Sequence, residues 1–579
     1  MNNSSPINPA TDKTICLIQL TRIGDLLQTM KAAQLFKTHY PDVRLILVGR
    51  KKFLAHLTFL LPKTFAKIYA LDYEQLVAPP EGSTTPLNAA LQRLRQWISL
   101  INQENIDVVV NLSFSPSSSY LSKLISAKHH LGLSRRNNGE LEIGGSWAQY
   151  IYATTMAGPL NPFSIIDLYQ LMLAPARDLA KNPLALAASH HSSTTELAVW
   201  RPSTLPADWA KRDFTLVVHP FASHGKKTWK IHKWGEVIYK IAKNLPSLKI
   251  VVVGGPHDLK DGHQLEDMAL IKQVMPQIEW QIGKGSISDL FHHLKTARML
   301  LAPDSMAQQL AMFSETPAVI LALGCVRPGE TTAYTPYNLV ISPRRGCFPC
   351  FLQDACPDYA CHAHLNETIV AQVVSEYLTT GAIDLAKFKQ DNSLYYREGL
   401  TLWASEIESN GLFNLRPLWG GQDVRDIFRQ LYRVAFSYDL AQIEGPAPFP
   451  QINGSLRQLL TQHQAGLHYL ADLSQFGKQY SQAIIQELAL SHPAMEKIKE
   501  LTQKIAEIED LQNILKKTYP YLSPLIDLGL VRKAHLAGNN LVHLAEASYY
   551  TYEHSFCQAQ IMHDLIQQTI DHYQSFARP

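Results

Sequence analysis

The residues with the clearest capacity for chemistry lie where short apolar segments end in polar turns. Residues 14–20 form an apolar run typical of a buried strand, and the turn after it contains Arg22 and Gly24 and brings Asp25 to the start of a helix. Ligands bind at the carboxyl ends of parallel strands, where the first N–H groups of a following helix are free. Asp25 is therefore a candidate general base, and the alternative is that it only caps the helix.

A basic loop follows a second apolar segment, residues 214–219, and leads into another helical pattern. Its Ser223, Lys226 and Lys227 combine a hydroxyl group and two ammonium groups close to a helix N-terminus. All of these groups favour a bound anion, and together they suit a diphosphate. The alternative is a basic loop that is simply solvated.

Two further strand ends carry polar or small residues. A glycine pair permits close approach of a ligand to the backbone, and the aspartate after it can accept hydrogen bonds from a ribose or sugar hydroxyl. A later strand ends in an aspartate and a helix start. Each segment alone also fits a turn or a helix cap, but their convergence favours one shared site. The residues that we expect there are Gly254, Gly255, Asp258, Asp304, Ser305 and Gln309.

Two runs of alternating strand and helix patterns must position these residues. Continuous apolar segments alternate with helical patterns in residues 13–190 and again in residues 200–380, as is typical of parallel sheets covered on both faces. We expect two doubly wound α/β domains that enclose a cleft, after a disordered segment at residues 1–12. Helical spacing dominates residues 385–579, which we interpret as a helical accessory domain.

One helical segment of that last region carries a regular apolar seam. Between residues 498 and 515 the apolar positions step by three and four, and they include Leu511. The seam is shorter than three full heptads. It therefore indicates an element of a helical bundle in preference to an independent coiled coil.

Composition and charge exclude several classes of protein. The chain has 53 Lys and Arg against 50 Asp and Glu, a net charge of +3, which is too small to indicate nucleic acid as the main partner. No apolar run reaches the ~18 residues that span a bilayer. The first residues lack the order of a signal peptide. We expect a soluble cytoplasmic protein, with peripheral attachment to the inner membrane left open.

Four cysteines crowd into a short segment: Cys347, Cys350, Cys356 and Cys361. Four thiolates can enclose a structural zinc or iron ion. The alternative is reduced or redox-paired cysteines that pack a loop. We do not expect a catalytic cysteine.

The motifs together resemble glycosyltransferase family 9, the heptosyltransferases, over about residues 13–380. The resemblance rests on Arg-Ile-Gly-Asp-Leu-Leu-Gln-Thr at 22–29, Ala-Ser followed by Lys-x-Trp at 222–229, the Gly-Gly-Pro after a strand, and the helix after Asp304. It implies the GT-B architecture, in which two Rossmann-like domains face each other. It also implies inverting transfer of a heptose from an ADP-sugar, without a catalytic metal or other required cofactor, in bacterial lipopolysaccharide biosynthesis.

The same resemblance implies roles for individual residues. Asp25 would deprotonate the acceptor hydroxyl as it attacks the anomeric carbon. Lys227, helped by Ser223, would hold the leaving diphosphate. Asp258, with the loop at Asp304, would contact the nucleoside or the sugar.

The chain departs from the family pattern at two places. Lys31 stands where the family usually has proline, and the segment Asp-Ser-Met-Ala-Gln-Gln at 304–309 lacks the family's glycine and histidine. A different nucleotide, a different sugar or a weakened donor site would fit this change. We expect the acceptor to be a lipopolysaccharide core, another glycan or a protein hydroxyl. The helices of residues 385–579 fit oligomerisation or docking of an acceptor protein.

Two other functions stay open from the sequence. A non-catalytic binding or scaffold protein would bind ADP-heptose without consuming it. A sugar-nucleotide epimerase on the same architecture would change its donor without any acceptor, so an assay with the donor alone separates it from a transferase.

Overall fold

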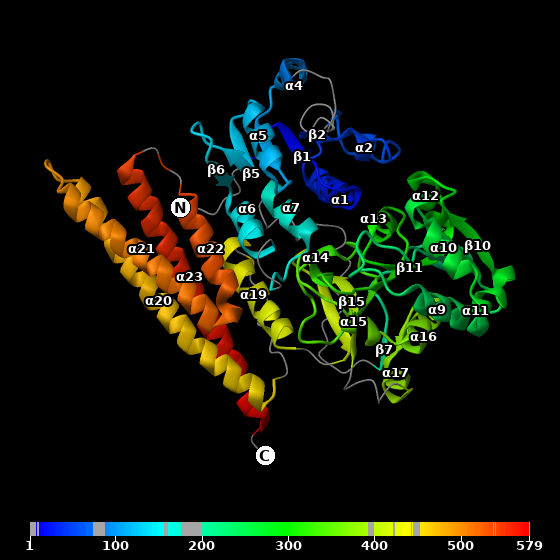
Figure 1. Cartoon of the computed structure of the whole chain (residues 1–579). Helices are drawn as coiled ribbons and strands as arrows, with labels where there is room; N and C mark the ends of the chain where they lie inside the picture. The colour runs from blue at the N-terminus through cyan, green and yellow to red at the C-terminus, as the bar shows by residue number, and fades with distance from the viewer. Residues whose placement is uncertain are drawn as a thin grey trace.

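A computed structural model of the chain shows two sheets and a helical region, so the fold class expected from the sequence is confirmed (Figure 1). Most of the expected disordered segment 1–12, and most of the connection between the two α/β runs, lie outside the described residues. The structure describes residues 7–8, 11–72, 87–155, 160–174, 198–391, 399–420, 423–441, 443, 452–536, 538 and 540–577.

The first sheet has parallel strands with one antiparallel strand at its edge. Ile15 and Leu17 of its central strand β1 pack with α1 and α7 on one face, whereas Cys16 and Ile18 pack with α4 and α5 on the other. Burial on both faces explains why the strand is a continuous apolar run. The strands, in spatial order, are β3 (Lys67–Leu71), β2 (Arg44–Arg50), β1 (Thr14–Gln19), β4 (Val108–Asn111), β5 (His129–Arg135) and the antiparallel β6 (Leu141–Gly144). The helices are α1 (Ile23–His39), α2 (Lys51–Leu54), α4 (Leu87–Asn102), α5 (Pro116–Leu124), α6 (Ser146–Tyr150) and α7 (Ile165–Leu173), with a π-helical turn η2 (Ile151–Thr155) after α6.

The second sheet is also parallel, except for a hairpin added at one edge. Its strands, in spatial order, are β10 (Ile278–Ile282), β9 (Lys249–Gly254), β8 (Asp213–Val218), β11 (Ala297–Pro303), β12 (Ala318–Leu321), β13 (Leu339–Pro343), β15 (Leu400–Ile407) and β16 (Phe413–Trp419). Strands β7 (Val199–Trp200) and β14 (Ile383–Asp384) pair separately. The helices are α9 (Ile231–Asn244), α10 (Leu259–Glu266), α11 (Ala269–Lys272), α12 (Ile287–Thr296), α13 (Met306–Phe313), α14 (Pro328–Thr331), α15 (Ala360–Ala363), α16 (Glu367–Thr380) and α17 (Leu385–Asp391).

The hairpin β15–β16 is a difference from the expected helical region that starts at residue 385. It pairs antiparallel with β13 and so extends the second sheet. Its tight turn contains Asn410 and Gly411, and Gly411 has a φ of 86°, which glycine adopts without strain. An Asn-Gly pair between two apolar runs is a strong hairpin signal, so the sequence does contain the information for this pair of strands.

The helices beyond this hairpin form an elongated bundle beside the two sheets (Figure 1). Helices α20 and α23 pack along each other, and they approach closely at Gly477, where an added Cβ would lie 2.6 Å from the Tyr552 ring. The predicted seam on α21 is wrong at one position. Leu511 is 48% exposed, and Gln512 is buried in its place, because Gln512 follows Ile508 by one full helical turn. The helices are α19 (Val424–Ala441), α20 (Gly454–Leu488), α21 (Met495–Thr518), α22 (Ser523–Ala534) and α23 (Leu541–Ala577).

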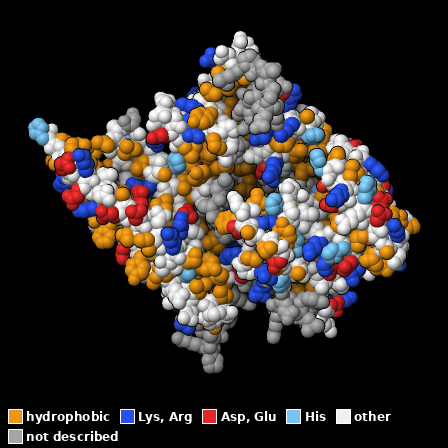
Figure 2. All heavy atoms as spheres, in the orientation of Figure 1, with side chains coloured by type: hydrophobic (Ala, Val, Ile, Leu, Met, Phe, Trp, Pro, Cys, Tyr) orange, Lys and Arg blue, Asp and Glu red, His pale blue; other side chains and the backbone are white. Residues whose placement is uncertain are grey.

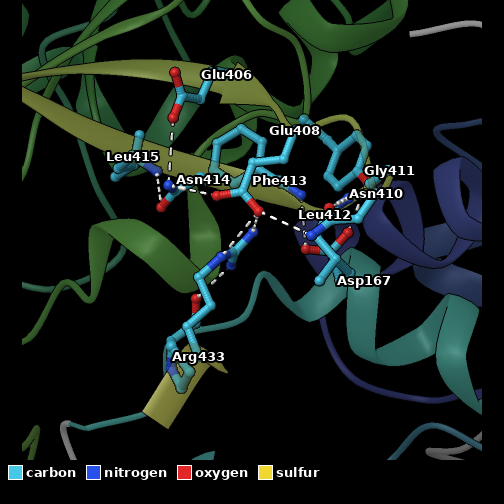
Figure 3. A network of polar contacts seen from close by, with 12 residues as sticks. Asp167, Glu406, Glu408, Asn410, Gly411, Leu412, Phe413, Asn414, Leu415 and Arg433 are labelled. Carbon is cyan, nitrogen blue, oxygen red and sulfur yellow. Dashed lines mark hydrogen bonds and ion pairs between the residues drawn. The ribbon is translucent and has the colours of Figure 1, made fainter. Parts of the chain in front are cut away.

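A buried polar network joins the three parts of the chain (Figure 3). The side chain of Asp167, on α7 of the first domain, lies 2.7 Å from the Tyr334 hydroxyl and accepts a hydrogen bond of 3.0 Å from the Phe413 N–H of the hairpin. Arg433, on α19, forms an ion pair of 2.9 Å with Glu408, between the two hairpin strands. The helical region is therefore fastened to both sheet domains.

Apolar side chains are interspersed with basic and acidic ones over both the helical bundle and the second domain (Figure 2). In the part of the chain that the structure describes, we find no helix that is long and apolar enough to cross a bilayer.

Candidate active site

The start of α1 faces the lysine loop of the second domain. The Arg22 guanidinium Nη1 donates a hydrogen bond of 3.3 Å to Ser223 Oγ. The carboxylate of Asp25, one helical turn further on, accepts a hydrogen bond of 3.0 Å from the Arg22 backbone N–H. Asp25 therefore caps α1, and the same turn touches the second domain.

Helices α1 and α13 form much of the contact between the two domains. At one end, Arg22 meets the loop that also reaches Asp304, just before α13. Away from that end, Lys31 of α1 faces Glu315, beyond the last turn of α13. The two helices thus run in the same general direction, and their N-termini, each with a partial positive charge, lie on the same side of the interface. Burial lowers the pKa of Lys31 and outweighs the opposing attraction of Glu315.

A cavity of about 320 Å³ opens where the two domains meet. Arg22 lines it from the first domain, and the remaining lining residues belong to the second. Its lining contains both cations and carboxylates, together with the apolar ring of Phe351. The charged lining residues are Arg22, Lys227, Asp304, Arg327 and Glu330. Asp25 is not among the lining residues, although its helix turn carries Arg22.

Lys227 and Asp304 form an ion pair in this cavity. Lys227 Nζ lies 2.6 Å from Asp304 Oδ2, and the side chains are 22% and 9% exposed. The other oxygen of Asp304 accepts a hydrogen bond of 2.5 Å from Gln308 Nε2. Burial opposes the charge on Lys227, but the attraction and hydrogen bond of Asp304 outweigh it and raise the pKa of Lys227. Asp304 thus fixes the ammonium group and keeps it charged.

Glu330 is a buried carboxyl group in the same cavity. Burial raises its pKa to about 7, against the opposing effects of Arg327 and a hydrogen bond with Asn161. Arg327 Nη1 lies 3.4 Å from Glu330 Oε1. Arg327 and Glu330 are not among the residues expected from the sequence. Both follow strand β12, so they could have been found by the rule that led to Asp304, namely that ligands bind at the carboxyl ends of parallel strands.

Lys226 is not among the residues that line the cavity. Its side chain is buried, and Nζ donates hydrogen bonds to the backbone carbonyls of Phe351 and Leu352, at 2.7 and 3.1 Å, and to that of Asp354. Lys226 therefore holds the loop that carries part of the cavity lining. A role in donor binding stays a prediction for this residue.

The glycine pair and Asp258 lie apart from the cavity lining. A Cβ at Gly254 would lie 2.6 Å from the Phe221 ring, so packing accounts for the glycine. The Gly255 N–H donates a hydrogen bond of 2.7 Å to Asp258 Oδ2. This is the geometry of a helix cap, which the sequence of this segment also fits. Their contacts with a donor stay a prediction.

Ser305 and Gln309 do not line the cavity, but each lies next to a residue that does. Ser305 is the N-cap residue of α13, and its hydroxyl lies 3.3 Å from His219 Nδ1. Gln309 Nε2 donates a hydrogen bond of 2.5 Å to the Thr331 carbonyl. Thr331 lines the cavity, so Gln309 positions the segment that carries Glu330.

The cysteine segment runs beside the cavity. Cys350 lines it, Cys347 is exposed and Cys361 is buried. Burial raises the pKa of the Cys350 and Cys361 thiols. The seven cysteines of the chain all lie among the described residues, and they are free thiols in the structure. Within the described residues, no group of three or more His, Cys, Asp or Glu side chains is arranged to hold a metal ion.

Comparison with known protein families identifies the class of enzyme. The model of glycosyltransferase family 9 (heptosyltransferase) matches residues 93–359, which include the lysine loop and Asp304 but not Asp25. The chain is a glycosyltransferase, and this segment matches family 9. The family expected from the sequence is thus confirmed, and the cavity lies between the two domains of this glycosyltransferase.

Solved structures similar to this glycosyltransferase include a family 9 glycosyltransferase from Veillonella parvula, at 15% identity over 65% of this chain and 98% of that one, with a TM-score of 0.41. Another is the Escherichia coli heptosyltransferase WaaC with ADP, at 14% identity over 63% of this chain and 99% of that one, with a TM-score of 0.41. A third is the iron-containing dodecameric glycosyltransferase TibC from E. coli, at 11% identity over 63% and 76%, with a TM-score of 0.33. No curated protein matches the sequence.

Proposed function

We propose that this glycosyltransferase transfers a heptose or a related sugar, with inversion, from an ADP-activated donor to a hydroxyl group. The acceptor that we propose is a lipopolysaccharide core, another glycan or a protein. The contact of Arg22 with Ser223 carries the proposal, because it brings the turn that holds Asp25 to the cavity that holds Lys227. A base from one domain and cations from the other are what a single displacement needs.

In the proposed reaction, Asp25 takes the proton of the acceptor hydroxyl. The hydroxyl oxygen bonds to the anomeric carbon while the bond from that carbon to the diphosphate oxygen breaks, so negative charge develops on the leaving diphosphate. Arg22 and Lys227 stabilise this charge, and fixed groups of this kind lower the barrier because they act most strongly in the transition state. Asp304 keeps the Lys227 ammonium in place, since their ion pair measures 2.6 Å.

Substitution of Asp25 by asparagine tests the base. Asparagine keeps an oxygen that can accept the Arg22 N–H, so the helix cap survives while the proton acceptor is lost. We expect transfer to fall by about 10²- to 10⁴-fold. Asp289→Asn is the matched control, because Asp289 caps α12 through the Ser286 N–H in the same way. Near wild-type transfer by the Asp25 variant would remove Asp25 from the mechanism.

Thermal shift measurements with nucleotide sugars test the donor. A donor present at ~100 times its Kd adds about 2.7 kcal/mol to the free energy of unfolding. We expect ADP-sugars to raise the melting temperature and UDP- or GDP-sugars to leave it unchanged. An assay with the donor alone should yield no new sugar nucleotide, whereas a changed donor would indicate an epimerase. Binding of ADP-heptose that is never consumed, with every acceptor class present, would indicate a scaffold.

For the helical region, we propose docking of an acceptor protein or of a second copy of the chain. Large apolar side chains are exposed on it, including Tyr469, Phe476, Leu511 and Ile514. Exposed apolar groups of this kind favour contact with another chain. Light scattering of the wild type and of Phe476→Ser measures the assembly state, and pull-down with acceptor proteins measures docking.

A further inference from the structure

The cations and carboxylates of the cavity nearly balance each other before any ligand binds. The charge of Lys227 is matched by Asp304 at 2.6 Å. A donor diphosphate brings two negative charges, so the cavity must offer more positive charge than Lys227 provides. Arg22, at the domain boundary, is one source.

Arg327, from the second domain, is the second source. Its side chain is 14% exposed, and the guanidinium lies over the Phe351 ring, 5.7 Å from its centroid. Both residues line the cavity. A guanidinium group that is stacked in this way loses little freedom on binding, and its planar fork matches two phosphate oxygens.

Glu330 shares this guanidinium. The distance of 3.4 Å between Arg327 Nη1 and Glu330 Oε1 is long for a hydrogen bond between charged groups, so the pair is loosely made. Groups from all three parts of the chain face the Glu330 carboxyl. They are Asn161 and Tyr150 of the first domain, Arg327 of the second and Arg429 of α19. Burial raises the pKa of Glu330 to about 7, so the carboxyl gains or loses its proton at neutral pH.

Building on the proposed function, we propose that Arg327 binds the donor diphosphate and that Glu330 takes up one proton from solvent when the donor binds. A diphosphate close to a buried carboxylate is repelled by it, and protonation removes that repulsion. The same proton removes the ion pair between Glu330 and Arg327, so more of the positive charge of the guanidinium acts on the phosphate oxygens. Glu330 is a positioning residue in this proposal, because it acts on the donor through Arg327.

Isothermal titration calorimetry measures the proton directly. ADP-glucose, UDP-glucose and GDP-glucose serve as probes, since their diphosphate diesters have no proton to gain or lose at neutral pH. Titrations at about pH 7.5 in buffers of different ionisation enthalpy should show uptake of about 0.8 proton per bound nucleotide, the share of Glu330 that is ionised there. At about pH 5.5 the uptake should be close to zero, because Glu330 already carries its proton.

Variants assign the proton and the phosphate contact. Glu330→Gln should bind the nucleotide without proton uptake. The matched control is Glu406→Gln, another carboxyl whose pKa burial raises but which lies outside the cavity lining, and it should take up the proton as the wild type does. Arg327→Gln should raise the Kd at least about tenfold, as expected when a hydrogen bond to a charged group is lost.

The wild type alone also tests the proposal, should Glu330→Gln fail to fold. Its Kd should rise as the pH rises above 7, by up to about tenfold per pH unit, because binding then requires a proton that Glu330 no longer holds. Binding with neither proton uptake nor this pH dependence, or equal uptake in Glu330→Gln, would overturn the inference and leave the proposed function intact. Failure of all three nucleotides to bind would overturn both.

Discussion

Asp167 offers the sharpest test of how the three parts of the chain are joined. It is fully buried, and burial raises its pKa from 3.8 to about 7, against the opposing effects of Tyr334, Arg433 and the Phe413 N–H. When the Asp167 carboxyl is protonated, each donor hydrogen in this network has an acceptor of its own. Its O–H can donate to the Tyr334 oxygen, the Tyr334 hydroxyl can donate to the Gly411 carbonyl at 2.9 Å, and Phe413 donates to the other oxygen.

The sign of the pH dependence follows from this shift. Between pH 3.8 and about 7, the folded protein holds a proton on Asp167 that the unfolded chain releases. The free energy of unfolding therefore falls as the pH rises through this range, and it levels off above pH 7. Each pH unit contributes about 1.4 kcal/mol, so the full effect is about 4 kcal/mol.

Substitution by asparagine imitates the protonated carboxyl at every pH. The amide group can donate to Tyr334, and its oxygen can accept from Phe413, so we expect little effect on stability near pH 4. By pH 8, the Asp167→Asn variant should exceed the wild type by up to about 4 kcal/mol, because it has no carboxyl to ionise. Urea denaturation from pH 4 to 8, with Asp472→Asn at an exposed site of α20 as control, measures this difference. Parallel pH profiles for the wild type and Asp167→Asn would refute the reasoning.

Three further substitutions probe packing and positioning. Gly477→Ala should destabilise the helical bundle by about 1–3 kcal/mol in thermal unfolding, because the added Cβ meets the Tyr552 ring. Gly454→Ala on the same helix is the control and should not destabilise it, since the Cβ added there meets no atom within 4 Å. Lys226→Met should cost about 2 kcal/mol and speed amide exchange in the loop whose carbonyls it binds; unchanged exchange would exclude this anchoring role. Arg433→Met should lower the free energy of unfolding in urea by about 3–5 kcal/mol, because it leaves the carboxylate of Glu408 without its partner in a mostly buried ion pair. A loss under about 1 kcal/mol would contradict this prediction.

Much of the two-domain fold could be predicted because its signals are local. The strand expected at residues 14–20 is β1, and the strand expected before the glycine pair is β9. Both are buried along their length, so each is a continuous apolar run. Edge strand β10 was missed because its sequence, Ile-Glu-Trp-Gln-Ile, alternates and is only half-buried, which removes that signal.

The candidate site could be predicted only in part. Strand-end reasoning found Lys227 and Asp304, but it could not show that they neutralise each other. It treated Lys226 and Lys227 alike, yet the first serves a loop and the second the cavity. Adjacent residues in a loop point in different directions, and only the surrounding chain decides what each one meets.

By itself, the sequence determined the order of strands and helices, the glycine turn before Asp25 and the family to which residues 93–359 belong, because these depend on neighbours along the chain. Only the tertiary structure decided the contact of Arg22 with Ser223, the burial of Glu330 by three separate parts of the chain, and the addition of the hairpin to the second sheet. Ion pairing and burial depend on groups far apart in sequence, and periodicity within a segment carries no information about them.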